Sequence, residues 1–203
     1  MDLSLVEKHC KIYKHDPLMF AYYLEKIRFD PGNNPSVLSV GCGRGAAISE
    51  FVALSNIYRQ KFNLELDYIG VDIKRENLSI PRKALGSAVT LIQANASDLT
   101  KFIRKRKFPL VLLRFPAVEA NPKIWRSIIS DLKDVIAPKG YLFATHAVEV
   151  GKYYLLKALM DAGYRISISE LNKHHGLDMK KLPRLKNYPG VIDKYVVIAS
   201  PLR

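Results

Sequence analysis

Three glycines at alternate positions, Gly41, Gly43 and Gly45, are the first residues whose spacing points to chemistry. They follow the short apolar run 37–40, which has the composition of a parallel strand buried on both faces. Because glycine lacks a Cβ atom, the chain can turn sharply there and let a ligand approach the backbone. A helix that starts near Ala46 would add unpaired N–H groups, which favour a polar or anionic ligand group.

An acid stands at the end of the next predicted strand. Residues 64–72 read as this strand, and it ends on Asp72. In nucleotide-binding α/β sheets, an acid in this place accepts hydrogen bonds from the ribose hydroxyls. The glycine turn and Asp72 together predict a ligand that contains a nucleoside. Two plainer readings stay open, namely that the glycines form only a structural turn and that Asp72 only caps the following turn or helix.

The elements that must position these residues alternate along the chain. The pattern predicts strands at 37–40, 66–71, 89–94, 110–113 and 141–145, and helices at 46–61, 75–85, 99–107, 123–136 and 150–162. Such alternation is typical of a parallel, doubly wound sheet. Two further strands, 165–171 and 194–199, have no helix-sized apolar pattern between them, so they are expected to pair antiparallel. We therefore expect one α/β domain, 1–203, with a mostly parallel seven-stranded sheet and an antiparallel last strand.

The two ends of the chain add less regular features. Residues 3–28 are expected to form two helices divided at Asp16-Pro17, and either to pack on the sheet or to cover the ligand site as an N-terminal helical cover, 1–30. The connection 172–190 is long and polar, and loops of this length are often functional. Its paired histidines, His174 and His175, lack acidic or cysteine companions, so we expect no metal.

The composition narrows the class of protein. A net charge of +13 over 203 residues favours a polyanionic partner such as RNA, DNA or an anionic membrane surface, or simply marks a basic protein. The basic run 104–107 is expected to be a solvated helix end, with a nucleic-acid contact as the alternative. No signal peptide or membrane span is indicated. The two cysteines, Cys10 and Cys42, fit a reducing compartment, so the expected location is cytoplasmic.

From about residue 18 onward, these pieces in this order resemble the class I S-adenosylmethionine-dependent methyltransferases. Segment 39–45 is similar to the family's acid-x-Gly-x-Gly-x-Gly motif, segment 114–116 to its substrate-side motif, and 137–141 to the turn before its fifth strand. The resemblance implies that S-adenosylmethionine is the cofactor, with the methionine part on the glycine turn, the ribose on Asp72 and the adenine beside Ile73, Asn95 and Ala96. The implied cofactor-binding residues are Ser39, Gly41, Cys42, Gly43, Gly45, Asp72, Ile73, Asn95, Ala96 and Arg114.

Three residues depart from the family pattern. Ser39 replaces the acid that opens the glycine motif, Asn95 replaces a common aspartate, and Pro109 stands where many members carry an acid. The amide oxygen of Asn95 can still accept a hydrogen bond from the adenine amine. These departures bear on cofactor affinity and catalysis, and they keep a non-catalytic cofactor-binding scaffold open.

Methyl transfer is an in-line displacement from a sulfonium, for which the protein mainly aligns the acceptor and excludes water. The candidates on the substrate side are Arg114, after the fourth strand, and His146 or Glu149, after the fifth. Each has a plainer interpretation, as a surface ion pair for Arg114 and as caps of the next helix for His146 and Glu149.

Two substrate classes and one other enzyme class remain. Arg114-Phe115-Pro116 also resembles the Arg-Phe-Pro of tRNA guanine-N7 methyltransferases, so the acceptor is expected to be RNA, such as tRNA, or a small molecule. A nicotinamide-dependent oxidoreductase is the other class, because Gly41-x-Gly43-x-x-Ala46 satisfies a looser dinucleotide pattern. The gap from these glycines to Asp72 is longer than the roughly 20 residues expected for it.

Overall fold

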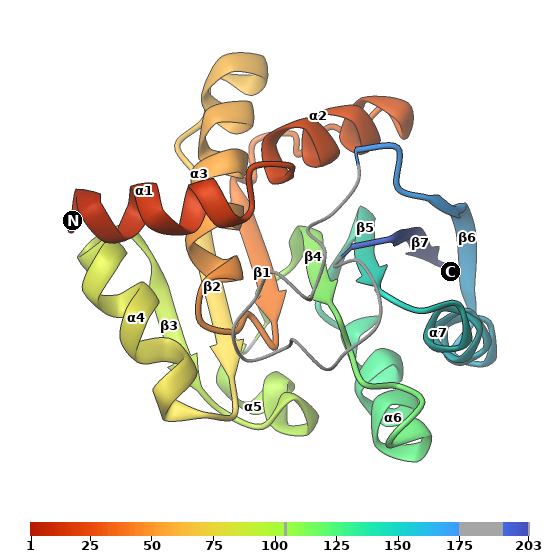
Figure 1. Ribbon diagram of the computed structural model, residues 1–203. Coiled ribbons are helices and arrows are strands. Elements are labelled where there is room, and N and C mark those ends of the chain that lie inside the picture. The colour runs from red at the N-terminus through yellow and green to blue at the C-terminus, as the bar shows by residue number, and fades with distance from the viewer. Residues whose placement is uncertain (104, 175–192, 203) are drawn as a thin grey trace.

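The chain folds into one seven-stranded sheet with helices on both faces, as a computed structural model that describes residues 1–103, 105–174 and 193–202 shows (Figure 1). The strand order is β3-β2-β1-β4-β5-β7-β6. β1 to β5 pair in parallel, whereas β7 runs antiparallel to both β5 and β6. The expected fold class is therefore confirmed. The strands are β1 (Ser36–Val40), β2 (Asp67–Asp72), β3 (Thr90–Gln93), β4 (Phe108–Arg114), β5 (Ile136–His146), β6 (Tyr164–Leu171) and β7 (Tyr195–Pro201).

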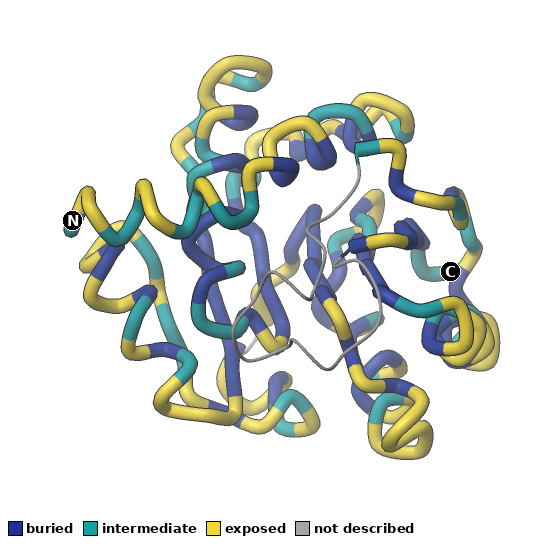
Figure 2. Tube along the Cα trace, viewed as in Figure 1, coloured by how far each residue is buried: buried dark blue, intermediate teal, exposed yellow. Residues whose placement is uncertain are grey.

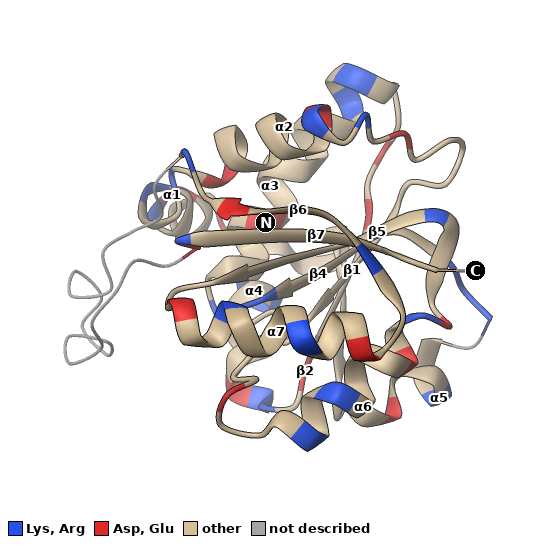
Figure 3. Ribbon diagram, turned by 90° about the vertical axis from the view of Figure 1, so that its right-hand side faces the viewer, with Lys and Arg blue, Asp and Glu red and all other residues tan. Residues whose placement is uncertain are grey.

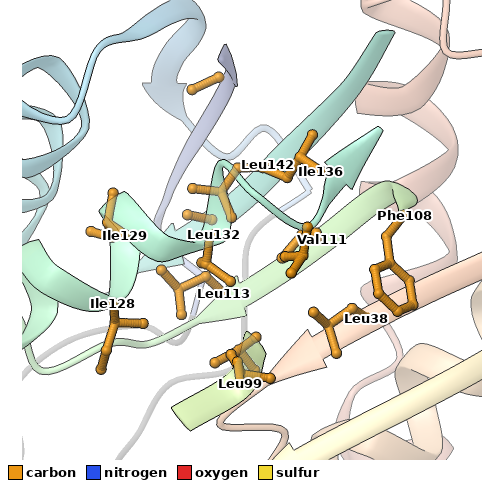
Figure 4. Packing of buried hydrophobic residues seen from close by; sticks show 14 of the residues in the cluster. Leu38, Leu99, Phe108, Val111, Leu113, Ile128, Ile129, Leu132, Ile136 and Leu142 are labelled. Atoms are coloured by element: carbon orange, nitrogen blue, oxygen red, sulfur yellow. The ribbon is translucent and has the colours of Figure 1, made fainter. Parts of the chain in front are cut away.

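Helices cover the sheet in two layers, each with its own apolar core. α2, α3 and α4 pack on one face, and α5, α6 and α7 pack on the other. Figure 4 shows part of the second core, where Leu132 of α6 lies near Leu113 and Leu142 of the strands. The helices are α1 (Leu3–Ile12), α2 (Asp16–Lys26), α3 (Ala46–Ile57), α4 (Arg75–Leu85), α5 (Leu99–Ile103), α6 (Pro122–Leu132) and α7 (Glu149–Asp161).

Burial explains why the central strands read as continuous apolar runs. Every residue of β1 and β4 is buried, because helices cover both faces of the sheet there (Figure 2). The outer strand β6 instead alternates between more and less buried residues. The apolar residues that predict the strands are thus the residues that the two layers of helices bury.

The boundaries differ most between α6 and β5. The expected helix 123–136 ends at Leu132, and Ile136 already pairs with Phe108 as the start of β5. The pairing then jumps to Leu110 and Tyr141, so residues 137–140 form an irregular insert in β5. A Cβ atom on Gly140 would lie 2.8 Å from the carbonyl oxygen of Phe108, so only glycine fits this approach of the strands.

Two other helices also end differently from the prediction. The helix expected at 99–107 ends at Ile103, and the one expected at 46–61 changes to a π-helical turn at Tyr58–Phe62. Pro109 lies inside β4, at the irregularity opposite the insert, where the missing N–H is tolerated.

The two N-terminal helices have different roles. α2 belongs to the core, since Met19, Phe20 and Tyr23 are fully buried against the sheet. This agrees with the packing interpretation of the segment. α1 has no buried residue and lies across α3 and α4. The turn between the two helices, at Tyr13, lines a cavity at the carboxyl ends of the central strands.

The charged residues lie mainly on the outside of the helical layers (Figure 3). In the basic run, Arg106 pairs with Asp67 and Lys107 donates to the carbonyl oxygen of Asp134, while Arg104 lies outside the described residues. Of the two histidines after β6, His174 packs edge-on against Tyr22, and His175 lies outside the described residues together with most of the connection 172–190. Among the described helices, none combines the length and the apolar character that a membrane crossing requires.

Replacing Phe20 by Ala tests whether α2 is part of the core. Truncation of a fully buried phenylalanine costs about 3–5 kcal/mol, so the free energy of unfolding in urea should fall by that amount. Leu18→Ala is the matched control, because Leu18 lies on the same helix and is 62% exposed. Equal stabilities of the two variants would show that α2 is not packed as described.

Candidate cofactor-binding and active site

Two adjoining cavities lie where β1, β2 and β4 end. The smaller has a volume of about 260 Å³ and the larger about 670 Å³. Both are lined by Gly41, Asp72, Asn77 and Phe115, so they meet at these residues. An elongated ligand can therefore extend from one cavity into the other.

The glycine turn forms one wall of the smaller cavity. Gly41 and Gly43 have φ angles of 67° and 66°, a left-handed conformation that glycine adopts without strain. The N–H groups of Gly41 and Cys42 both donate to the carbonyl oxygen of Val71, at 2.8 and 3.1 Å, and tie the turn to the end of β2. Gly45 precedes α3, and a Cβ atom there would meet His9 of α1 at 2.5 Å. Gly45 does not line either cavity.

Asp72 connects the glycine turn to α4. Its carboxylate accepts hydrogen bonds from the N–H of Gly43 at 3.0 Å, the N–H of Lys74 at 2.9 Å and the side-chain amide of Asn77 at 3.0 Å. The carboxylate thus does cap the turn before α4. It also lines both cavities, and two carboxylate oxygens offer about four acceptor sites, so capacity for a ligand hydroxyl remains.

The larger cavity has apolar walls suited to a flat ring. Ile73, Asn95 and Ala96 line it, as expected for an adenine subsite, and α6 contributes Ile124 and Trp125. Ile73 and Ile124 leave more than half of their surface exposed, so apolar surface in this cavity is accessible to a ligand. The side-chain oxygen of Asn95 accepts from the N–H of Ser97, which fixes its orientation.

Arg114, at the end of β4, is buried and forms hydrogen bonds with three carboxylates. Its guanidinium forms paired hydrogen bonds with Asp16 and with Asp193, and a fifth with Glu50 at 3.4 Å. These contacts use all five N–H donors of an arginine. Although Arg114 lines the smaller cavity, its guanidinium cannot donate to a ligand without giving up a carboxylate.

The three carboxylates respond differently to burial. Burial raises the pKa of Asp16 and of Glu50 above the ordinary value, because the Arg114 charge only partly offsets it. Burial also acts on Asp193, but Arg114 and a hydrogen bond to His15 outweigh it, so the pKa of this carboxyl is lowered. Asp193 therefore stays ionised to a lower pH than an ordinary carboxyl group, and it lines the smaller cavity together with Tyr13.

A metal does not suit this cluster. The ligand atoms of His15, Asp16 and Asp193 lie within 4.8 Å of one another, a spacing that a metal ion could bridge. The Nη2 atom of Arg114, however, already donates to both carboxylates at this place. A cation there would have to displace the guanidinium.

Ser39 points away from the cavities and into the same cluster. Its hydroxyl donates to Glu50 at 2.7 Å, and so does the hydroxyl of Tyr68 at 2.7 Å. Glu50 therefore brings a carboxylate next to the position where the related motif has its acid. Ser39, predicted to contact the cofactor, lines neither cavity in the structure.

His146 lies behind the cavities and does not line them. Its ring accepts from the N–H of Val148 at 3.3 Å and donates to the carbonyl oxygen of Pro116 at 3.1 Å. The bond to Val148 holds the turn before α7, although the structure gives the helix itself no side-chain cap. Glu149 is exposed in the first turn of α7 and lines neither cavity.

The sequence interpretation missed Tyr13, Glu50 and Asp193. The burial of Glu50 could have been predicted from the sequence. It lies four residues before Leu54 in the apolar helix α3, so the two side chains share the buried face of the helix. Tyr13 and Asp193 carried none, because their partner Arg114 lies about a hundred and about eighty residues away in the sequence.

Replacing Arg114 by Met would leave three carboxylates buried without their cation. Removal of one partner of a buried ion pair costs about 3–5 kcal/mol, so the free energy of unfolding near pH 7 should fall by that amount. Carboxyls whose folded pKa exceeds the unfolded value of about 4 stabilise the fold only at low pH and lose this stabilisation as the pH rises. The difference in unfolding free energy between Arg114→Met and the unaltered protein should therefore become smaller toward pH 4.

Urea unfolding at pH 4 and pH 7 measures this difference. Arg126→Met is the matched control, because Arg126 pairs with Asp161 on the surface and is half exposed. An equal loss of unfolding free energy in the two variants at pH 7 would refute the role of Arg114 in holding the three carboxylates.

Comparisons with known proteins agree with this architecture. No family model matches the chain. A curated relative from Methanothermobacter thermautotrophicus, described as a probable cobalt-precorrin-6B C(15)-methyltransferase (decarboxylating), is 25% identical over 153 residues, which are 72% of this chain and 70% of the relative.

Solved structures show the same fold. A glycopeptide N-methyltransferase in complex with S-adenosyl-L-methionine superposes with a TM-score of 0.61 and 12% identity over 91% of this chain and 94% of the other. Precorrin 8W decarboxylase from Methanobacterium thermoautotrophicum superposes with a TM-score of 0.55 and 17% identity over 91% and 90%. The comparisons confirm the resemblance to the class I S-adenosylmethionine-dependent methyltransferases, for which S-adenosylmethionine is the expected cofactor.

Proposed function

We propose that this protein transfers a methyl group from S-adenosylmethionine to a small-molecule acceptor. The observation that carries the proposal is the meeting of the two cavities at Asp72, beside the glycine turn. This arrangement fits a nucleoside joined to an amino-acid chain. The adenine would lie in the larger cavity on Ile73 and Asn95, the ribose on Asp72, and the methionine chain along the glycine turn.

The described residues would bind and align rather than react. When bound, the cofactor supplies the reactive methyl group on its sulfonium. Asp72 would accept hydrogen bonds from the ribose hydroxyls, and the apolar side chains of Ile73, Ile124 and Trp125 would exclude water from the adenine. The Arg114 cluster would hold the wall of the smaller cavity, formed by Tyr13 and Asp193, in place.

A small molecule is favoured over RNA as the acceptor. Asp72 and Asp193 line the smaller cavity, and Arg114 has no N–H left to meet a phosphate. The phosphates of RNA would therefore gain no hydrogen bond from Arg114, and Arg44 is the other cation that lines this cavity. The curated relative, whose name gives a cobalt-precorrin as substrate, supports a small-molecule acceptor.

Calorimetric titration with S-adenosylmethionine, repeated on Asp72→Asn, tests the cofactor site. Hydrogen bonds to a charged acceptor contribute about 1.5–3 kcal/mol, so the variant should bind roughly 10- to 100-fold more weakly. Asp131→Asn, on α6 and outside both described cavities, is the matched control. Absence of binding by the unaltered protein at millimolar cofactor would favour the scaffold, and binding of NADH instead would favour the oxidoreductase.

Transfer of a labelled methyl group identifies the acceptor class. The protein would be incubated with methyl-labelled cofactor and, separately, with a small-metabolite extract and with total RNA. Label should appear in the small-molecule fraction. Label found only in RNA, and lost on ribonuclease treatment, would overturn the choice of acceptor while leaving the methyltransferase activity in place.

A further inference from the structure

We infer that His9 is a positioning residue that acts through its protonation state. The neutral ring would seat helix α1 against Gly45 and so hold Tyr13 in the wall of the smaller cavity, and uptake of a proton would release the helix. The inference goes beyond the proposed function, because it does not depend on which ligand the cavity takes. It also gives a role to Gly45, the third glycine of the motif, which lines neither of the two cavities.

Gly45 forms a notch that two side chains of the N-terminal segment fill. A Cβ atom on Gly45 would lie 2.5 Å from the Nδ1 atom of His9 and 3.2 Å from the Cε2 atom of Tyr13. Gly45 itself has a negative φ angle, −107°, so the backbone conformation alone does not demand glycine. The missing side chain of Gly45 is needed for the close approach of His9 and Tyr13.

The remaining contacts of α1 are slight. No residue of this helix is buried, and its apolar contacts with α3 and α4 are made by the partly buried Leu5 and Val6. The N–H of Asp2 donates to the carbonyl oxygen of Ala84 at 2.8 Å and ties the start of the helix to the end of α4. Segments with few buried contacts open at a low free-energy cost. A change at the contact of His9 can therefore shift the balance between docked and released helix.

The Nδ1 atom of His9 is buried and has no hydrogen-bond partner among the described residues. In a neutral imidazole one nitrogen carries no proton, so Nδ1 can face Gly45 as an unprotonated atom. In the imidazolium both nitrogens carry a proton, and the N–H at Nδ1 would then be buried without a partner. A buried, unpaired donor of a charged group is costly, so proton uptake would drive the ring out of the notch.

The groups on α1 itself do not favour the imidazolium. Burial, and to a lesser degree the charge of Lys8, lowers the pKa of His9 below its ordinary value. Tyr13 lies one helical turn further along and stays neutral, because burial raises its pKa to about 12. Burial likewise raises the pKa of the neighbouring Cys10 thiol, which therefore supplies no negative charge.

The charged residues of the neighbouring elements are engaged elsewhere. Glu50 of α3 belongs to the buried ion cluster around the β4 arginine. Glu76 of α4 lies 3.8 Å from Arg44 of the glycine turn. Lys83, near the end of α4, acts on the carboxylate of Asp2 at the start of α1. Among the described residues, these neighbours leave no carboxylate to compensate a positive charge on the histidine.

Tyr13 transmits the state of His9 to the smaller cavity. Its N–H donates to the carbonyl oxygen of His9 at 3.0 Å, and Tyr13 lines the cavity. Release of α1 would therefore remove part of the cavity wall. A histidine whose pKa is lowered by docking opposes docking only at a pH where the released histidine is protonated. The helix should thus be docked above the ordinary histidine pKa of about 6.5 and released progressively below it.

Hydrogen exchange of the α1 amides, measured by mass spectrometry and corrected for the intrinsic effect of pH, tests the inference. From pH 7.5 to pH 5 the protection of these amides should fall at least about threefold, while that of α6 stays unchanged. His9→Asn should abolish this fall, because asparagine takes up no proton and has a similar helix propensity. His174→Asn is the matched control and should keep it, because His174 also has a buried, unpaired ring nitrogen but packs on Tyr22.

Gly45→Ala tests the seat of the helix separately from pH. The added Cβ would meet His9, so the α1 amides should lose protection at least about tenfold already at pH 7.5. Combining it with His9→Ala frees space for the added methyl group and should recover part of the protection.

Three results would overturn the inference. They are unchanged α1 protection at pH 5 in the unaltered protein, an undiminished fall in His9→Asn, and equal protection of α1 in Gly45→Ala and the unaltered protein. None of them bears on the proposed function, because no ligand is present in these measurements.

Discussion

The ion cluster around Arg114 is the interaction on which the rest of the site depends. One guanidinium joins the start of α2 through Asp16, α3 through Glu50, and the segment before β7 through Asp193. Burying charges is costly, and the attraction between them offsets this cost only when every partner is present. The wall of the smaller cavity is therefore assembled from segments that are distant in sequence, and it exists only once the sheet has formed.

The fold, and the place of the glycine turn and Asp72 at one edge of the sheet, could be predicted from the sequence because their signals are local. A glycine turn after an apolar strand and an acid after the next strand are each determined by a few neighbouring residues. Gly41 and Asp72 accordingly lie where expected. The start of β5 could not be predicted, because Ile136 fits a helical apolar stripe as well as a buried strand.

The remainder of the site could not be predicted because it depends on tertiary contacts. Nothing near Asp193 in the sequence indicates that it meets an arginine about eighty residues earlier. His146, expected on the substrate side, lies behind Phe115 for the same reason. The charge of the whole chain was also a poor guide, since the smaller cavity is lined by two acids, Asp72 and Asp193, and two cations, Arg44 and Arg114. Net charge affects how readily partners associate with the protein, whereas the residues that line the cavity determine which molecule can bind and react there.

A crystal structure of the protein with S-adenosylhomocysteine or sinefungin would test the central claim most directly. The account predicts one ligand across both cavities, with the ribose hydroxyls bonded to Asp72 and the adenine between Ile73 and α6. A ligand bound elsewhere on the chain, or one whose ribose is remote from Asp72, would contradict it.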